Sequence, residues 1–87
     1  MKIRDGFVVR IVAGESVVIA LKEVSKEFNG VIRLNETGRF LWDMLVNGAD
    51  EESLVKALLS EYDVSEDIAR ADVSSFVSKL KGANIVE

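Results

Sequence analysis

The stretch RLNETGRFLWDML, Arg33–Leu45, lies near the middle of the 87-residue chain and changes character within a few residues. Before Asn35, Ile32 and Leu34 fall on one face of an extended segment and Val31 and Arg33 on the other. This is the period of two that a strand shows. Asn35 is a favourable helix N-cap. After it, apolar residues recur at helical spacing, at Phe40, Leu41, Met44 and Leu45. We expect Trp42 to lie on the flank of this helix, half exposed. The stretch therefore predicts a strand that passes directly into a helix.

The residues before this stretch have the pattern of strands. In FVVRIVA, Phe7–Ala13, every second side chain falls on one face. Residues 13–16 form a turn and VVIAL, Val17–Leu21, returns, so the two segments predict a hairpin. A charged connection over residues 22–28 and the turn dipeptide at residues 29–30 lead to a third short strand, Val31–Leu34.

Two more helices are predicted after the first, which ends at Asn47-Gly48. Asp50 caps the second helix, whose apolar stripe is Leu54, Val55, Leu58, Leu59 and Tyr62. Ser65 caps the third, whose stripe is Ala69, Val73, Phe76, Val77 and Leu80. The tail NIVE adds a short extended segment. Three strands followed by three helices indicate an α+β fold.

A glycine in the first turn of the first helix also needs a reason. Gly38 costs roughly 1 kcal/mol relative to Ala at a helical position. We therefore expect another part of the chain to approach the backbone closely at this residue.

Composition narrows the function. The chain is short enough for one domain, residues 1–87. It has no Cys and no His, which excludes disulfides, thiolate or Ser-His catalysis and ordinary zinc sites, so we expect no enzyme activity and no cofactor. No apolar run approaches the ~18 residues of a membrane span, and the N-terminus lacks the pattern of a signal peptide. We expect a cytoplasmic protein without a membrane partner.

The run EFNGVIRLNETGRFLWDML, together with EYDVSEDIARADVSSFVSKLK and the short tail, resembles the PqqD family. These small proteins are associated with pyrroloquinoline quinone biosynthesis and, more widely, serve as precursor-peptide recognition elements for ribosomally made, modified peptides. The resemblance covers the chain from about Gly6 to Glu87 and is most specific in LNETG, Leu34–Gly38. It implies a three-stranded antiparallel sheet followed by three helices in a winged helix-turn-helix-like arrangement.

The same resemblance implies that residues 1–87 form a single peptide-recognition domain that performs no chemistry. A leader peptide would lie as an extra strand on the open edge of the third strand, with the third helix as the other wall. The domain would present it to a modifying enzyme, often of the radical S-adenosylmethionine class.

The sequence permits strand addition at this edge. Val31–Leu34 contains no Pro, so each backbone N–H is available, and alternation separates Ile32 and Leu34 from Val31 and Arg33. Arg33 also discourages indiscriminate edge pairing and suits a leader carboxylate. On the third helix, the flank beside the core stripe supplies the second wall. The candidate peptide-binding residues are Val31, Ile32, Arg33, Leu34, Ile68, Asp72, Ser75 and Lys79.

Two other functions stay open. The second and third helices have helix-turn-helix proportions, which suits a winged-helix DNA-binding regulator. Charge opposes this, because the third helix begins SED and residues 35–87 hold eleven acidic against five basic side chains. We therefore expect no nucleic-acid partner. A structural dimerisation module is the other alternative, since open strand edges also pair with copies of themselves, and a homodimer would cover the groove.

Overall fold

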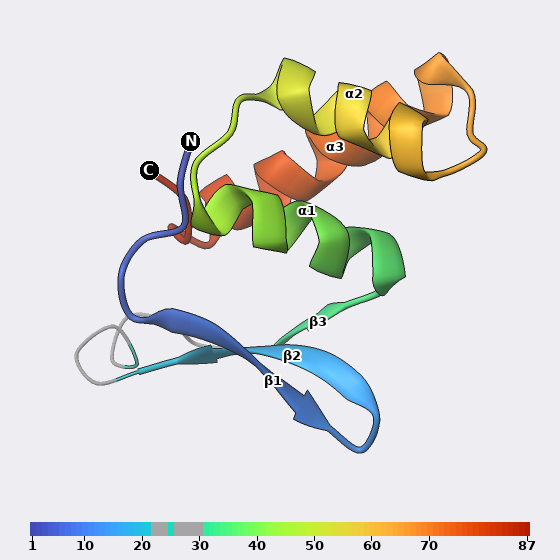
Figure 1. Ribbon diagram of the computed structural model, residues 1–87. Coiled ribbons are helices and arrows are strands. Elements are labelled where there is room, and N and C mark those ends of the chain that lie inside the picture. Colours follow the sequence, from blue (N-terminus) through green and yellow to red (C-terminus); the bar gives the residue numbers. More distant parts are fainter. Residues whose placement is uncertain (22–24, 26–30) are drawn as a thin grey trace.

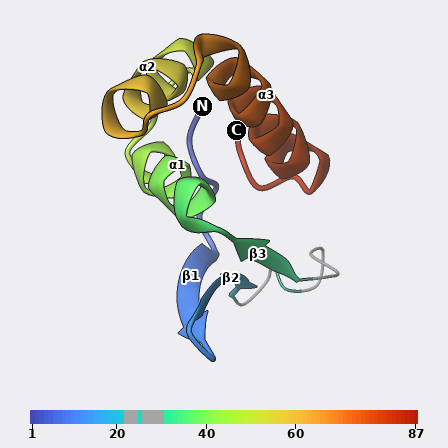
Figure 2. The same ribbon diagram turned by 90° about the vertical axis from the view of Figure 1, so that its right-hand side faces the viewer.

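Three strands and three helices make up the computed structural model, which describes residues 1–21, 25 and 31–87 (Figure 1). They are β1 (Phe7–Val12), β2 (Glu15–Ala20), β3 (Ile32–Leu34), α1 (Glu36–Val46), α2 (Glu51–Glu61) and α3 (Glu66–Gly82). The strands form one antiparallel sheet in the order β1-β2-β3, and the helices lie together on one side of it (Figures 1 and 2). The predicted α+β fold is confirmed.

The hairpin between β1 and β2 is tighter than predicted. Val12 pairs with Glu15 across a turn of two residues, Ala13 and Gly14. Their φ angles are 52° and 80°, and positive φ at both central residues is what a type I′ turn requires. Because that turn matches the twist of the strands, β2 already begins at Glu15, two residues before the predicted start.

The third strand is one residue shorter than predicted and lies at the edge of the sheet. Its register partners on β2 are Ser16 for Leu34, Val17 for Arg33 and Val18 for Ile32. Leu34 and Ile32 are buried whereas Arg33 is exposed, so the predicted alternation is confirmed. The predicted connection over residues 22–28 lies outside the described residues except for Ser25, and the turn at residues 29–30 lies outside them entirely.

All three predicted helix starts are confirmed by their caps. The side chain of Asn35 accepts a hydrogen bond from the Gly38 N–H at 2.8 Å. Asp50 does the same for the N–H three residues later in α2, at 2.7 Å, and Ser65 for that in α3, at 3.2 Å. Each bond satisfies one of the amide groups that the first turn of a helix leaves without a partner.

The first helix buries Leu41 and Leu45 of the predicted stripe, but its buried face extends to Trp42 instead of to Phe40 and Met44. Trp42 is only 2% exposed, so the prediction of a half-exposed side chain is wrong. Phe40 and Met44 are only partly buried, and the Phe40 ring packs edge-on against Tyr62 at a centroid distance of 5.6 Å. The reason lies in the layering: α1 lies between the sheet and the other two helices (Figure 2), so it buries side chains on two sides.

The two ends of the chain pair with each other. Ile3 forms an antiparallel bridge with Val86, and the Arg4 N–H donates to the carbonyl of Ile85 at 2.8 Å. Ile85 is fully buried, so the predicted extended tail exists and closes the core beneath the N-terminal segment. Among the described residues, no helix has the length and hydropathy needed to cross a bilayer.

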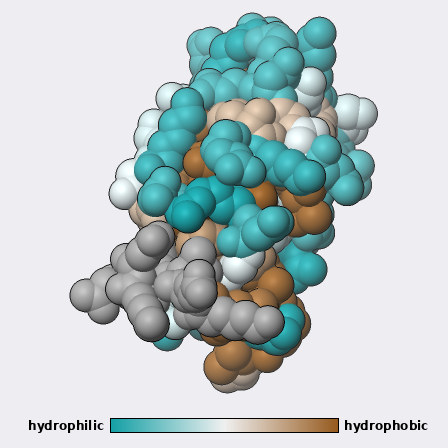
Figure 3. Space-filling model, turned by 90° about the vertical axis from the view of Figure 1, so that its left-hand side faces the viewer, coloured by the Kyte–Doolittle hydropathy of each residue, from teal (hydrophilic) through white to brown (hydrophobic). Residues whose placement is uncertain are grey.

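The sheet end and the helical end of the molecule differ in polarity. On the face shown in Figure 3, hydrophobic side chains gather at the end formed by the strands, whereas the helical end is mostly hydrophilic. Ile11 and Val12, next to the hairpin turn, are 64% and 53% exposed. Of the alternate residues Phe7, Val9 and Ile11, the first two reach the core and Ile11 does not.

Candidate functional site

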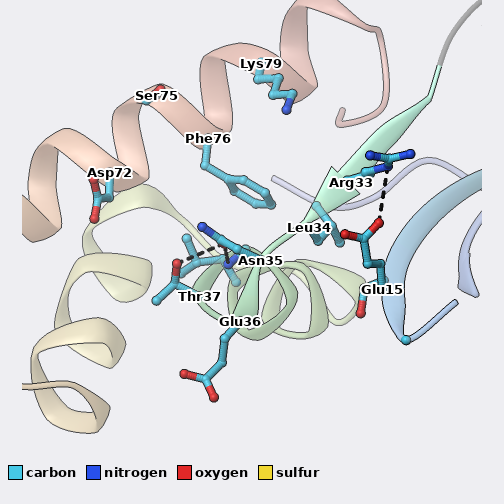
Figure 4. A pocket seen from close by; sticks show the side chains of 14 residues that line it. Glu15, Arg33, Leu34, Asn35, Glu36, Thr37, Asp72, Ser75, Phe76 and Lys79 are labelled. Atoms are coloured by element: carbon cyan, nitrogen blue, oxygen red, sulfur yellow. Dashed lines mark hydrogen bonds and ion pairs between the residues drawn. The ribbon is translucent and has the colours of Figure 1, made fainter. Parts of the chain in front are cut away.

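A groove of about 720 Å³ runs between the edge strand β3, the start of α1 and one face of α3 (Figure 4). The turn between β1 and β2 closes one side of it. The residues that line it are Gly14, Glu15, Ser16, Arg33, Leu34, Asn35, Glu36, Thr37, Gly38, Leu41, Asp72, Ser75, Phe76 and Lys79.

The direction of the backbone groups in β3 follows from the phase of the hairpin ladder. In an antiparallel pair, successive residues point their N–H and C=O alternately toward one neighbouring strand and away from it. The Leu21 N–H donates to the Gly6 carbonyl at 2.7 Å, next to the pairing of Phe7 with Ala20. The odd-numbered residues of β2 therefore face β1, and the even-numbered residues face β3.

This alternation leaves one residue of β3 with its backbone N–H and C=O pointing away from the sheet. Ser16 and Val18 turn their backbone groups toward β3, where their register partners are Leu34 and Ile32. Arg33 lies between these partners, so its N–H and C=O point away from β2 to the open edge of the sheet. An added strand would find its first pair of backbone partners there.

Gly38 forms the floor of the groove. A Cβ built on it would lie 3.6 Å from Phe76 Cε1, 3.6 Å from Leu34 Cβ and 3.1 Å from Asn35 Oδ1. The predicted close approach to this glycine is confirmed. The tight neighbour is the capping oxygen of Asn35, whereas the Phe76 ring and Leu34 lie at ordinary van der Waals distance from that position.

The wall contributed by α3 consists of Asp72, Ser75, Phe76 and Lys79. Their spacing of i, i+3, i+4 and i+7 places them on one face of the helix. Phe76 was predicted to belong to the core stripe, but it is only partly buried and lines the groove. On the helix surface Phe76 lies between the core stripe and the flank that carries Ser75. This border position could have indicated that its ring also lines the groove.

Two charged residues of the α3 wall have no ion-pair partner in the part of the chain that the structure describes. Arg33 is paired with Glu15 at 3.5 Å, and both side chains are largely exposed. Lys79 and Asp72 form no ion pair within 4 Å among the described residues. They face the groove at opposite ends, with Lys79 on the side of Arg33 and Asp72 beyond Asn35 and Thr37 (Figure 4).

Five of the eight predicted site residues line the groove: Arg33, Leu34, Asp72, Ser75 and Lys79. The side chain of Ile32 is absent from it because it alternates into the core, where it is 7% exposed. Val31 lies just before β3 and is 70% exposed. Ile68 is 53% exposed and lies one helical turn before Asp72, beyond the lining residues. A role in peptide binding stays a prediction for all eight residues, whether or not they line the groove.

The first half of α3 is acidic, and its arginine is held by carboxylates. Arg70 donates two hydrogen bonds to Glu52 of α2, at 2.9 and 3.0 Å, and one to Glu66 at 3.0 Å. These bonds lower the pKa of Glu52 and raise that of Arg70 above its usual range. Among the described residues, no three potential metal ligands of the His, Cys, Asp or Glu type come together.

Comparison with known proteins agrees with this geometry. The family model described as coenzyme PQQ synthesis protein D (PqqD) matches residues 11–86. No curated protein sequence matches the chain. One similar solved structure is TbiB1 in complex with the TbiA(beta) leader peptide, with 26% identity and a TM-score of 0.77 over 100% of this chain and 95% of that one.

A second similar structure is lasso peptide synthetase B1 complexed with the leader peptide. It shares 21% identity at a TM-score of 0.73, covering 97% of this chain and 93% of that one, and it supports the fold. The family model covers nearly all the described elements, from the end of β1 to the C-terminal tail. Together with the fold, this match shows that the chain belongs to the PqqD family.

Proposed function

We propose that this protein binds the leader segment of a ribosomally made precursor peptide as a fourth strand on the open edge of β3, against α3. The observation that carries the proposal is the groove itself, in which the outward backbone of Arg33 faces a wall of α3 side chains. The similarity to TbiB1, solved with a leader peptide, supports the same conclusion.

Successive side chains of an added peptide strand point to opposite faces of the sheet, so each one contacts a different surface of the protein. The peptide residue opposite Arg33 shares the outer face of the sheet, away from the helices. Its two neighbours point the other way, into the groove. The neighbour opposite Leu34 meets apolar surface from Leu34, Leu41 and Phe76, so an apolar leader residue at that position is expected to supply most of the affinity.

The role of the domain is to present the leader peptide to a modifying enzyme. The sequence contains neither His nor Cys, and the groove is an open channel suited to an extended peptide. The protein holds the leader while a separate modifying enzyme, of the radical S-adenosylmethionine class or of another class, acts on the rest of the precursor. It contributes no catalytic group and no cofactor of its own.

Charge favours a peptide over DNA as the ligand. A recognition helix needs free basic side chains near its N-terminus to contact bases and phosphates. In α3 that region carries Ser65, Glu66 and Asp67, and Arg70 is already held by two glutamates. A homodimer through an open strand edge stays a prediction, and it would compete with the leader only if it used β3.

An NMR titration tests the proposal. The ligand is the leader segment of a precursor peptide encoded beside this protein's gene, and a scrambled peptide of the same composition is the control. We expect the leader to shift the amide signals of Arg33 and of residues 72–79, because these line the groove. Shifts confined to α2, or equal shifts with the scrambled peptide, would rule the groove out as the binding site.

A further inference from the structure

We propose that the groove reads the order of charges along its peptide and selects the pattern basic-x-apolar-x-acidic, written from N- to C-terminus. The inference rests on the proposed function and adds the direction and chemistry of the ligand. It starts from Lys79 and Asp72, the oppositely charged residues at the two ends of the α3 wall.

These two charges are available to a ligand. Ion pairs on the surface of the described residues join Arg33 with Glu15, Arg39 with Asp43, and Arg70 with two glutamates. Lys79 and Asp72 take part in none of them, and both are exposed. They are seven positions apart on α3, which is about 10 Å along the helix axis.

The sheet fixes the direction of the peptide. Both strand pairs in the sheet are antiparallel, and an antiparallel partner makes the stronger ladder. A peptide antiparallel to β3 runs from the start of α1 toward Ile32. Its N-terminal part therefore passes Asp72, and its C-terminal part passes Lys79 (Figure 4).

The pairing with Arg33 then assigns each position. The peptide residue before the paired one lies opposite Leu34 and meets Phe76, so it is apolar. The residue after the paired one lies opposite Ile32, within reach of Lys79, so it is acidic. Two positions before the apolar residue, the next inward side chain approaches Asp72 and Glu36, so it is basic. The two charged positions of the peptide are four residues apart, which is about 13 Å in an extended strand. This is slightly longer than the spacing of Asp72 and Lys79 along the helix axis, and the long Lys79 side chain can make up the difference.

Two peptides of identical composition test this order. The forward peptide has the sequence GSKTLTESG and the reverse peptide GSETLTKSG, both capped at their ends. Each is titrated into the full chain and followed by the amide signal of Arg33. At low salt we expect the forward peptide to bind roughly three- to tenfold more tightly, the range that a few surface ion pairs provide, and the preference to shrink at high salt.

A charge-swapped protein supplies the decisive control. The double variant D72K/K79E has the same net charge and changes only exposed positions on α3. We expect its preference to be reversed, with the reverse peptide bound more tightly. Equal binding of the two peptides by the native chain, or an unchanged preference in the variant, would overturn the proposed charge order while leaving strand addition intact. If neither these peptides nor the natural leader shifted the Arg33 amide, the proposed function would fall and the charge order with it.

Discussion

Replacing Arg33 by proline removes a single backbone N–H from the open edge of β3. Because the N–H groups of Ile32 and Leu34 face β2, the pairing that holds β3 in the sheet is left in place. Proline is tolerated at such an edge position, where its missing N–H would have faced solvent. The variant therefore separates the fold from the proposed binding edge.

The expected loss follows from the two hydrogen bonds that an added strand would make with this residue. Each is worth about 0.5–1.5 kcal/mol net, and the proline ring also blocks the approach that the second bond needs. Losing both weakens binding by about 1–3 kcal/mol, or roughly 5- to 150-fold in Kd. Fluorescence polarisation with a labelled leader peptide measures this, and circular dichroism checks that the variant is folded.

Two matched variants complete the test. Arg33→Ala keeps the N–H and removes only the exposed side chain that pairs with Glu15, so it measures what the side chain contributes, and R33P should bind the leader more weakly than R33A. Leu34→Pro removes an N–H that faces β2 and should unfold the edge of the sheet. If folded R33P bound the leader within twofold of R33A, the backbone of residue 33 would not be the pairing partner.

Three further predictions concern stability. Trp42→Ala should cost about 3–5 kcal/mol in urea unfolding, because the side chain is almost wholly buried; a loss below about 1 kcal/mol would contradict that burial. Ala13→Asn should stabilise the hairpin by about 0.5–1 kcal/mol, since Asn tolerates the φ of 52° better than Ala, and a lower melting temperature would argue against the turn. Arg70 lowers the pKa of Glu52 in the folded protein, so the hydrogen bonds between them stabilise the fold fully at pH values above the ordinary glutamate pKa of 4.5. This stabilisation is lost as the pH falls through the lowered pKa of the folded state. The stability difference between the native chain and Glu52→Gln should therefore be present at pH 7 and vanish in acid; a difference independent of pH would refute the link.

Local signals predicted the secondary structure well. Asn35, Asp50 and Ser65 were found as helix caps because a cap is recognised by residues within one turn of it. The two faces of β3 were assigned correctly because alternation depends only on neighbours. The hairpin start was missed because Ala13 is an uncommon residue at positive φ, so the turn looked longer in sequence than it is.

Where the spacing of apolar residues gave a wrong location for a side chain, tertiary packing was the cause. Trp42 is buried because α1 has partners on two sides, which a single apolar stripe does not reveal. Phe76 lies at the border of the core, where it is only partly buried and lines the groove, because β3 and the start of α1 face that side of α3. Ile68 lies beyond the groove because the end of β3 faces α3 further along the helix.

The sequence by itself determined the order of strands and helices, the helix starts and the separation of Ile32 and Leu34 from Arg33 on the two faces of β3. Only the tertiary structure decided that Asp72, Ser75, Phe76 and Lys79 lie across from Arg33 and Leu34 to form one groove. The physical reason is distance along the chain. Propensity, capping and alternation act over a few residues, whereas this groove depends on contacts between segments roughly forty residues apart, and packing of the whole core sets their positions.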